Sequence, residues 1–306
     1  MCCLFGMIDY DHSFTGKQKT KIIHALATSA EARGTDASGI AYNLGGKLHV
    51  YKRPLPGHKL PLRIPNDTVV VMGHTRMTTQ GDGKRNYNNH PFQARAGQTA
   101  FALAHNGVLH NDRTLRKSMK LPRTKIETDS FIAVQLLQYR NAINFDSLRY
   151  MAEKVDGSFS FTVLDEQNNL YFVKGDSPLC ICHCPEQGFY LYASTGAILM
   201  NALDNIPYPL GGLEQIDMQG GDLLMITPDG GQQRTRFQFD DFFSLNWRSP
   251  WRGCCCRTYH RTLDDYTSDL KSVAGAYGLS PDQIDQLLTD GFTHEEIEDY
   301  LYCGEI

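Results

Sequence analysis

Short apolar runs, rich in β-branched and aromatic residues, recur along residues 1–230 and predict strands. Several runs are apolar at consecutive positions, as in strands that are buried on both faces of a sheet. Glycine-containing turn sequences lie between them, for example at residues 43–46 and 228–231. The strands predicted on this basis are residues 69–72, 101–104, 159–164, 171–173, 189–192 and 223–226.

Helical periodicity is confined to fewer segments. Residues 17–32 place Ile22, Ile23 and Leu26 on one face, and residues 129–139 carry a similar apolar stripe. Many strands with a few long helices favour stacked sheets covered by helices over a chain of alternating strands and helices. We therefore expect an α+β fold.

The pattern changes after the last of these strands. Residues 1–230 are predicted to form one domain. Residues 231–260 show neither the strand pattern nor the helical periodicity and predict a connector. Residues 261–306 predict a small helical tail, because Ser280 is followed directly by a proline and three positions later by a glutamine, a common start of a helix. Residues 293–296 repeat this kind of start. We favour a solvated appendage over a partner-docking module.

Composition and charge are those of an ordinary globular protein. Of the 306 residues 41% are hydrophobic, and the net charge of −4 provides no general attraction to nucleic acid or anionic membranes. No apolar run reaches the ~20 residues of a membrane-spanning helix, and no basic and then apolar start indicates a secretory signal. We therefore expect a cytoplasmic protein with no nucleic-acid or membrane partner, whose nine cysteines are thiols.

Cys2 carries the sharpest chemical signal in the chain. Aminopeptidases remove Met1 when the second side chain is small, which would leave a thiol and a free α-amine on one residue. An α-amine has an unperturbed pKa near ~8 and can accept the thiol proton near neutral pH. Cys2 is therefore a candidate nucleophile that carries its own base. If Met1 is retained, the alternative is a catalytically silent binding or regulatory subunit.

Five segments, read together, match the motifs of one known family. In chain order they are MCCLFG at the start, RGTDASGI from Arg33, GHTRMTTQG from residue 73, HNGVLHN from His105 and IETDS from residue 126. Their order and spacing resemble those of class II glutamine amidotransferases, in the N-terminal-nucleophile hydrolase superfamily. The resemblance covers residues 1–230 and implies a four-layer αββα sandwich of two mostly antiparallel sheets, followed here by a small helical tail.

The resemblance also implies a reaction. Cys2 would attack the side-chain amide of glutamine to form a thioester, and water would then release glutamate while ammonia departs. The oxyanion that develops needs preorganised hydrogen-bond donors. The resemblance assigns these to the side chain of Asn106 and the backbone N–H of Gly107, and it calls for no cofactor and no metal.

Free glutamine carries an α-carboxylate and an α-ammonium, so its pocket needs both charges. The resemblance assigns the carboxylate to Arg76, whose planar fork suits bidentate binding, with Thr79 completing the cradle. Asp129 is assigned to the ammonium. Arg33 is expected to support the terminal loop, and His74 to shape the pocket rather than to transfer protons.

Three residues beside the expected pocket depart from the family motifs. Cys3 replaces a glycine, Met77 replaces a tryptophan and Gln80 replaces a histidine. The altered rim leaves open an alternative substrate, a γ-glutamyl or other linear amide that would react through the same thioester. The second thiol beside Cys2 also raises the possibility of a redox-sensitive pair.

The sequence shows no domain that would consume the ammonia. Members of the family usually carry one, but residues 231–306 are too short for it and lack a phosphate-binding glycine pattern. We expect either a separate synthase subunit as partner or a stand-alone amidase. Cys180, Cys182 and Cys184, and the cysteines at 254–256, do not match the spacing of zinc ligands, so we interpret them as buried thiols and a cysteine-rich turn.

Overall fold

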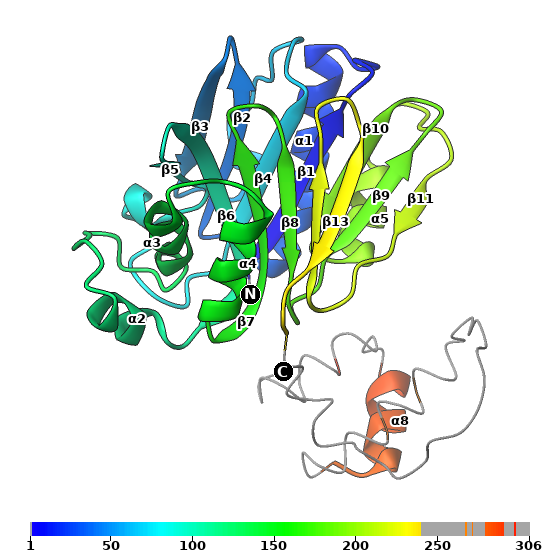
Figure 1. Ribbon diagram of the computed structural model, residues 1–306. Coiled ribbons are helices and arrows are strands. Elements are labelled where there is room, and N and C mark those ends of the chain that lie inside the picture. Colours follow the sequence, from blue (N-terminus) through cyan, green and yellow to red (C-terminus); the bar gives the residue numbers. More distant parts are fainter. Residues whose placement is uncertain (1, 240–266, 268–270, 272–278, 291–296, 298–306) are drawn as a thin grey trace, which may run out of the picture. The chain divides into compact units, whose positions relative to one another are not determined.

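The computed structural model describes residues 2–239, 267, 271, 279–290 and 297. The chain divides into two compact units, residues 1–247 and 248–306. In the first unit, two β-sheets lie face to face with helices on their outer sides (Figure 1).

The larger sheet has seven strands. In spatial order they are β11 (Glu214–Ile216), β9 (Cys180–Cys184), β10 (Phe189–Ala193), β1 (Cys3–Asp9), β4 (Val70–Arg76), β2 (Ala37–Leu44) and β3 (Lys47–Arg53). All neighbouring strands in it are antiparallel. The first strand of the chain therefore lies in the centre of the sheet, between β10 and β4, with Cys3 opposite Thr75.

The second sheet has six strands, again all antiparallel. In spatial order they are β13 (Gln232–Arg236), β12 (Asp222–Ile226), β8 (Leu170–Lys174), β7 (Gly157–Asp165), β6 (Thr99–Leu109) and β5 (Phe92–Ala96). The register of β6 on β7 sets Asn106 opposite Ser160 and Gly107 opposite Phe159.

Helices cover the outer face of each sheet. The helix α1 (Gly16–Ser29) and the later helix α5 (Gly196–Asp204) pack on the seven-stranded sheet. The pair α3 (Phe131–Arg140) and α4 (Phe145–Lys154) packs on the six-stranded sheet, and α2 (Asp112–Ser118) precedes that pair in the chain. Short 3-10 helices span Ala30–Arg33, Gly57–Lys59 and Asn86–Asn88.

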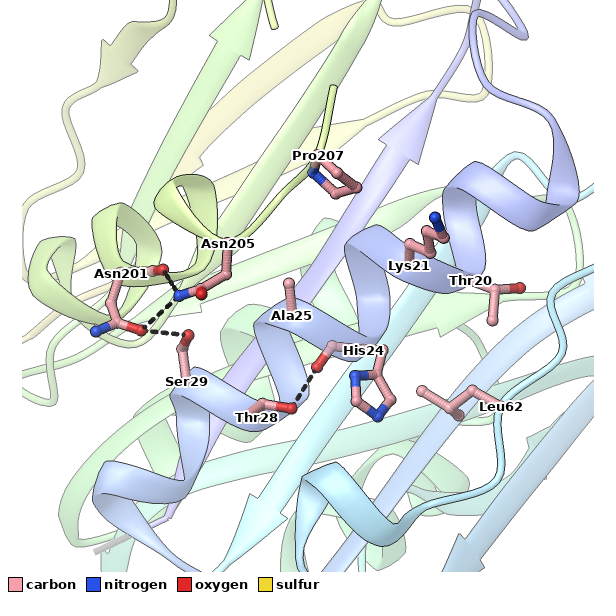
Figure 2. Close-up of a pocket in the computed structure, with 10 residues that line it drawn as sticks. All are labelled: Thr20, Lys21, His24, Ala25, Thr28, Ser29, Leu62, Asn201, Asn205 and Pro207. Carbon is pink, nitrogen blue, oxygen red and sulfur yellow. Dashed lines mark hydrogen bonds between the residues drawn. The ribbon is translucent and has the colours of Figure 1, made fainter. Parts of the chain in front are cut away.

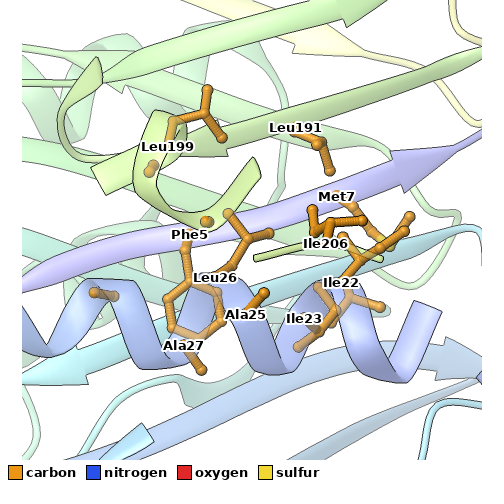
Figure 3. Close-up of a cluster of buried hydrophobic side chains, with 14 of the residues drawn as sticks. Phe5, Met7, Ile22, Ile23, Ala25, Leu26, Ala27, Leu191, Leu199 and Ile206 are labelled. Carbon is orange, nitrogen blue, oxygen red and sulfur yellow. The ribbon is translucent and has the colours of Figure 1, made fainter. Parts of the chain in front are cut away.

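Local sequence explains where α1 begins and which face it buries. Thr15 and Gln18 form a capping box, in which each side chain accepts a hydrogen bond from the backbone N–H of the other residue. The apolar stripe that includes Ile22 and Leu26 packs against Phe5 of β1 and against side chains of β10 and α5 (Figure 3). Each large side chain buried in this way contributes about 1.5–3 kcal/mol.

Alternation along β1 divides its side chains between two cores. Cys3 and Phe5 pack in the outer core under α1, whereas Leu4 and Ile8 lie in the layer between the two sheets. That inner layer also contains apolar side chains of the six-stranded sheet, so the sheets share one apolar interior. By the same alternation, Cys2 and Cys3 point to opposite sides of the sheet.

The predicted four-layer αββα architecture is confirmed. All the predicted strands overlap strands of the two sheets, and the predicted helices overlap α1 and α3. One boundary needs correction: β13 lies within the expected connector, residues 231–260, yet it pairs with β12 along its whole length. The sheet therefore continues past residue 230. The division at residue 261 stays a prediction.

The second unit contains α8 (Pro281–Thr289), which begins as predicted. The side chain of Ser280 accepts a hydrogen bond from the N–H of Gln283, and Gln283 reaches back to the N–H of Ser280. The helix buries Ile284 against Ile297. The second predicted helix start, at residues 293–296, lies outside the described residues. Within the described ranges, no helix is both long and apolar enough to cross a membrane.

Candidate active site

Cys2 lies at the N-terminal end of β1, in the centre of the seven-stranded sheet, and is half-buried. Its Sγ donates a hydrogen bond to the carbonyl oxygen of Met77, 3.5 Å away and one residue beyond the end of β4. Its own carbonyl oxygen accepts a hydrogen bond of 3.1 Å from Nε of Arg33. Arg33 thus contacts the backbone of the candidate nucleophile.

Burial raises the pKa of the Cys2 thiol. A backbone hydrogen bond with Met77 and the positive charge of Arg76 oppose this increase, while the negative charge of Asp129 adds to it. The two side chains assigned to the α-charges of glutamine therefore lie close enough to act on the thiol. Because the thiol is protonated at neutral pH, it needs a base before it can act as a nucleophile.

Cys3 faces away from this site. It is fully buried in the core under α1, and its Sγ lies 3.2 Å from the carbonyl oxygen of Leu4. Burial raises its pKa too. Both cysteines are free thiols. The alternative of a redox-sensitive pair finds no support here, because adjacent side chains of a strand point to opposite faces.

Asn106 and Gly107 lie near the end of β6, in the opposite sheet. Asn106 is buried, and its Nδ2 donates a hydrogen bond of 3.2 Å to Oγ of Ser194. Gly107 has φ +134°, and a Cβ at this position would lie 2.0 Å from the carbonyl oxygen of Ser158. Only glycine allows so close an approach in this backbone conformation.

Arg76 ends β4 and is buried, which lowers its pKa. Its Nη1 donates to Oδ1 of Asn89 at 2.7 Å, and its Nη2 donates to the carbonyl oxygen of Gln80 at 2.5 Å. The guanidinium therefore supports the chain that follows β4, which we name the 77–90 loop. Thr79 lies in this loop with its side chain exposed. Binding of a carboxylate by Arg76 and Thr79 stays a prediction.

Asp129 lies two residues before α3 and is buried. Its Oδ2 accepts a hydrogen bond of 2.6 Å from the backbone N–H of Leu109, the last residue of β6. Oγ of Ser130 lies 3.4 Å from the other carboxylate oxygen. Asp129 is thus hydrogen-bonded to β6, the strand that carries Asn106. This strand belongs to the six-stranded sheet, whereas Cys2 precedes a strand of the seven-stranded sheet.

His74 connects the two sheets. Its Nε2 donates a hydrogen bond of 3.0 Å to the carbonyl oxygen of His105, which fixes the tautomer because a carbonyl only accepts. Burial lowers the pKa of His74 to about 3, and it also lowers the pKa of His90 and His105. These three imidazoles are therefore neutral near pH 7. They position neighbouring residues and carry no charge.

Several side chains and one glycine hold the loops around Cys2. Oδ2 of Asp36 accepts a hydrogen bond of 2.7 Å from the backbone N–H of Thr78, while the N–H of Asp36 donates to the carbonyl of Arg76 at 3.0 Å. A Cβ on Gly34 would lie 2.5 Å from the backbone of Arg76. Glycine at this position therefore allows the segment before β2 to lie directly against the end of β4.

Sequence reasoning missed two of the residues that hold the site together. Ser194, far from the motifs in sequence, contacts Asn106. Asn88 is fully buried and exchanges two hydrogen bonds with Glu127, of 2.8 and 2.9 Å. The only sequence signal for the second contact is the asparagine pair at 88–89, seven residues after the end of the GHTRMTTQG motif. Ser194 has no comparable signal.

The cysteine cluster lies elsewhere. Cys180 and Cys182 alternate along β9 and face the core under α5, with Cys184 beside them. Among the described residues, no group of three or more His, Cys, Asp or Glu side chains is arranged to hold a metal ion. The cysteines at 254–256 lie outside the described residues.

A separate cavity of about 600 Å³ lies between α1 and the end of α5 (Figure 2). It shares no residue with the candidate active site. Its lining combines polar and aliphatic side chains, namely Thr20, Lys21, His24, Ala25, Thr28, Ser29, Leu62, Asn201, Asn205 and Pro207.

Two stacked antiparallel sheets lie between helix layers, with a cysteine at the start of a central strand, as the motifs predicted. Residues 74–201 match the family model described as glutamine amidotransferase domain. This match agrees with the resemblance to class II glutamine amidotransferases that the motifs indicated.

Similar proteins include the enzyme glutamine--fructose-6-phosphate aminotransferase [isomerizing]. The chain is 31% identical to that of Staphylococcus epidermidis over 210 residues, 65% of this chain and 33% of the relative. The corresponding protein of Halobacterium salinarum is 29% identical over 188 residues, 60% of this chain and 30% of the relative. The chain thus spans about a third of the length of these curated relatives.

Solved structures share the fold. Glutamine phosphoribosylpyrophosphate amidotransferase from B. subtilis, complexed with ADP and GMP, has a TM-score of 0.60 at 21% identity, over 78% of this chain and 50% of that chain. A structure titled as the allosteric regulatory enzyme of purine biosynthesis has a TM-score of 0.62 at 20% identity, over the same shares.

Proposed function

We propose that this chain hydrolyses the side-chain amide of glutamine through a thioester on Cys2, releasing glutamate and ammonia. The observation that carries the proposal is the position of the Cys2 thiol, which bonds to the carbonyl oxygen of Met77 directly after Arg76 and is influenced by the charges of Arg76 and Asp129. Oγ of Ser194 adds a link between β1 and Asn106, the candidate oxyanion donor. These contacts support the assignment of a nucleophile, an oxyanion donor and both counter-charges of an α-amino acid to one end of the two sheets.

The proposed mechanism requires removal of Met1. The α-amine of Cys2 then accepts the thiol proton, which is needed because burial raises the pKa of the thiol. The thiolate attacks Cδ of glutamine, and Asn106 and the N–H of Gly107 stabilise the oxyanion. The protonated amine transfers its proton to the departing ammonia. Water, deprotonated by the same amine, finally hydrolyses the thioester.

Recognition of free glutamine is assigned to Arg76, Thr79 and Asp129. A guanidinium has five N–H donors, so the bonds from Arg76 to the 77–90 loop leave donors for the α-carboxylate. One oxygen of Asp129 is engaged by the N–H of Leu109, and the other would receive the α-ammonium. His74 and Arg33 support the site without contacting substrate.

Replacement of the nucleophile tests the proposal. Cys2→Ala should abolish release of glutamate from glutamine without changing the melting temperature, because the thiol is a chemical rather than a packing group. Cys182→Ala is the matched control: its thiol is partly buried on β9, two strands away from β1, so activity should be retained. Mass spectrometry of the active protein should show a chain that begins at Cys2. Glutaminase activity in Cys2→Ala equal to that of the wild type would refute the assignment.

A γ-glutamyl amide is the second candidate substrate. It carries the same α-charges, and Met77 at the rim, which is 51% exposed, replaces a larger aromatic residue of the family motif. A comparison of kcat/KM for glutamine and for γ-glutamyl amides decides between them. We favour glutamine as the substrate, because its amide nitrogen carries no substituent that the site would have to accommodate.

We also propose a synthase subunit as the partner that accepts the ammonia, because similar proteins are named for the transfer of an amino group from glutamine to fructose-6-phosphate. Copurification with such a subunit, and ammonia-dependent product formation by the pair, would support this partner. A cytoplasmic location stays a prediction.

A further inference from the structure

Ser194 makes two contacts that join the halves of the site. It directly follows β10 and is fully buried. Its Oγ accepts a hydrogen bond of 2.9 Å from the backbone N–H of Leu4 and another of 3.2 Å from Nδ2 of Asn106. One oxygen atom therefore binds β1 of the seven-stranded sheet and β6 of the six-stranded sheet.

This link matters because the reacting groups belong to different sheets. Cys2 stands two residues before Leu4, whereas Asn106 extends from the opposite sheet. The distance from the thiol to the oxyanion donor therefore depends on how the two sheets are held together at this end. An oxyanion donor must be placed to within a few tenths of an ångström to be effective.

The amide of Asn106 also needs an anchor. The terminal torsion of an asparagine side chain is broad, so an unanchored amide rotates easily. In the described part of the chain, Nδ2 bonds to Ser194 whereas the buried Oδ1 has no partner. Ser194 therefore sets which amide group faces the thiol. One of the two N–H groups of Nδ2 is used, and the other remains for the oxyanion.

We propose that Ser194 is a positioning residue of the glutaminase reaction, which orients the Asn106 amide relative to Cys2. This proposal rests on the proposed function. The backbone of β6 is held independently, because His74 donates to the carbonyl oxygen of the neighbouring His105. Loss of the Ser194 hydroxyl should therefore release the amide while the strand stays in place.

The kinetic signature follows from this arrangement. Ser194→Ala should lower kcat for glutamine about 10- to 100-fold, a part of the loss expected when an oxyanion donor is removed. KM should change less than threefold, since Arg76 and Asp129 do not touch Ser194. Ser194→Thr, which keeps the hydroxyl, should restore most of kcat. If Ser194→Ala does not fold, Ser194→Cys carries the test, because its weaker acceptor should give a smaller loss of the same kind.

A double-mutant cycle with Asn106→Ala separates positioning from a general structural role. If Ser194 acts through Asn106, Ser194→Ala should cause less than a twofold further loss of kcat in the Asn106→Ala background. An equal loss in both backgrounds would overturn the proposal. Alkylation of Cys2 by iodoacetamide needs no oxyanion donor, so its rate should stay unchanged in Ser194→Ala. A large change in that rate would also overturn it.

One readout does not depend on activity. The side-chain amide signal of Asn106 in an NMR spectrum, assigned by its absence in Asn106→Asp, should shift and exchange faster with solvent in Ser194→Ala but not in Ser194→Thr. An unchanged signal would overturn the positioning role even in an active enzyme. Conversely, a wild-type protein without Cys2-dependent glutaminase would contradict the proposed function while leaving the amide measurement informative.

Discussion

Gly107 shows how one backbone position constrains the candidate oxyanion hole. Residues that have a side chain rarely adopt the backbone φ of +134° seen at Gly107, and the carbonyl of Ser158 lies where the Cβ of such a residue would be. The neighbouring strand therefore approaches as closely as it does only because residue 107 has no side chain. The close approach of the Ser158 backbone also fixes the direction of the N–H of Gly107.

Replacement of Gly107 tests this constraint at the level of one residue. Gly107→Ala should lower the free energy of unfolding by about 1–3 kcal/mol through backbone strain, and kcat by more than tenfold. Gly212→Ala is the matched control, because a Cβ there meets nothing within 4 Å. Urea unfolding and glutaminase assays measure both effects. Equal stability of the two variants would contradict the strain.

At the scale of elements, the apolar pattern predicts six interior strands, but it misses the edge strands and also interior strands such as β1 and β2. The strands at 101–104 and 159–164 are apolar because both of their faces are covered. In contrast, β13 consists of polar and charged residues at the edge of its sheet, so no hydrophobic pattern marks it. The bond between Ser194 and Leu4 joins residues 190 positions apart, and no local pattern reports such a contact.

The motif residues were predictable for a different reason. Cys2, Arg76, Asn106 and Asp129 are found from a family resemblance, which encodes chemistry rather than packing. The contacts of Arg76 with the 77–90 loop depend on how that loop folds back, and only the structure shows them.

The 77–90 loop is held by buried amides more than by surface charges. Asn88 is fully buried and bonds to Glu127, whereas Arg85 pairs with the same carboxylate at an exposed position. Asn88→Ala should raise KM for glutamine about 5- to 10-fold, because a buried partner is lost and the support of Arg76 weakens. Arg85→Ala should change KM less than twofold, as exposed ion pairs contribute about 0–1 kcal/mol. Similar KM values for the two variants would contradict this ranking.

At the scale of the whole first unit, polar side chains bridge the sheets at both ends of an apolar interior. His74 and Ser194 make the bridges near Cys2. Farther along, Nδ2 of Asn43 donates to the carbonyl oxygen of Asp165 at 2.7 Å. Hydrogen bonds as well as apolar packing therefore join the two sheets, which restricts sliding of one sheet over the other.

The buried histidines of this layer make stability depend on pH. The pKa of His74 is about 3 in the folded chain and ~6.5 when unfolded, so the unfolded state binds more protons between these values. The contribution of neutral, buried His74 to the free energy of unfolding is fully present above pH ~6.5 and is lost as pH falls toward 3. We expect the free energy of unfolding to drop between pH 7 and pH 5.

Urea unfolding at a series of pH values measures this slope. His74→Gln removes one titrating group and should reduce the slope by up to about 1.4 kcal/mol per pH unit. A slope in His74→Gln as steep as in the wild type would contradict the role of this imidazole.

The way the 77–90 loop is attached has a consequence for evolution and engineering. Its anchors are side chains, at Asp36, Arg76 and Glu127, whereas the nucleophile and the oxyanion donors belong to the strands. The pocket rim at Met77 and Thr79 thus lies in this loop, whereas Asn106 and Gly107 lie in a strand. A transplanted loop that keeps the three anchors can change which amide enters the site while the reacting atoms retain their geometry. Exchange of this loop is therefore the change to make first when a different amide substrate is sought.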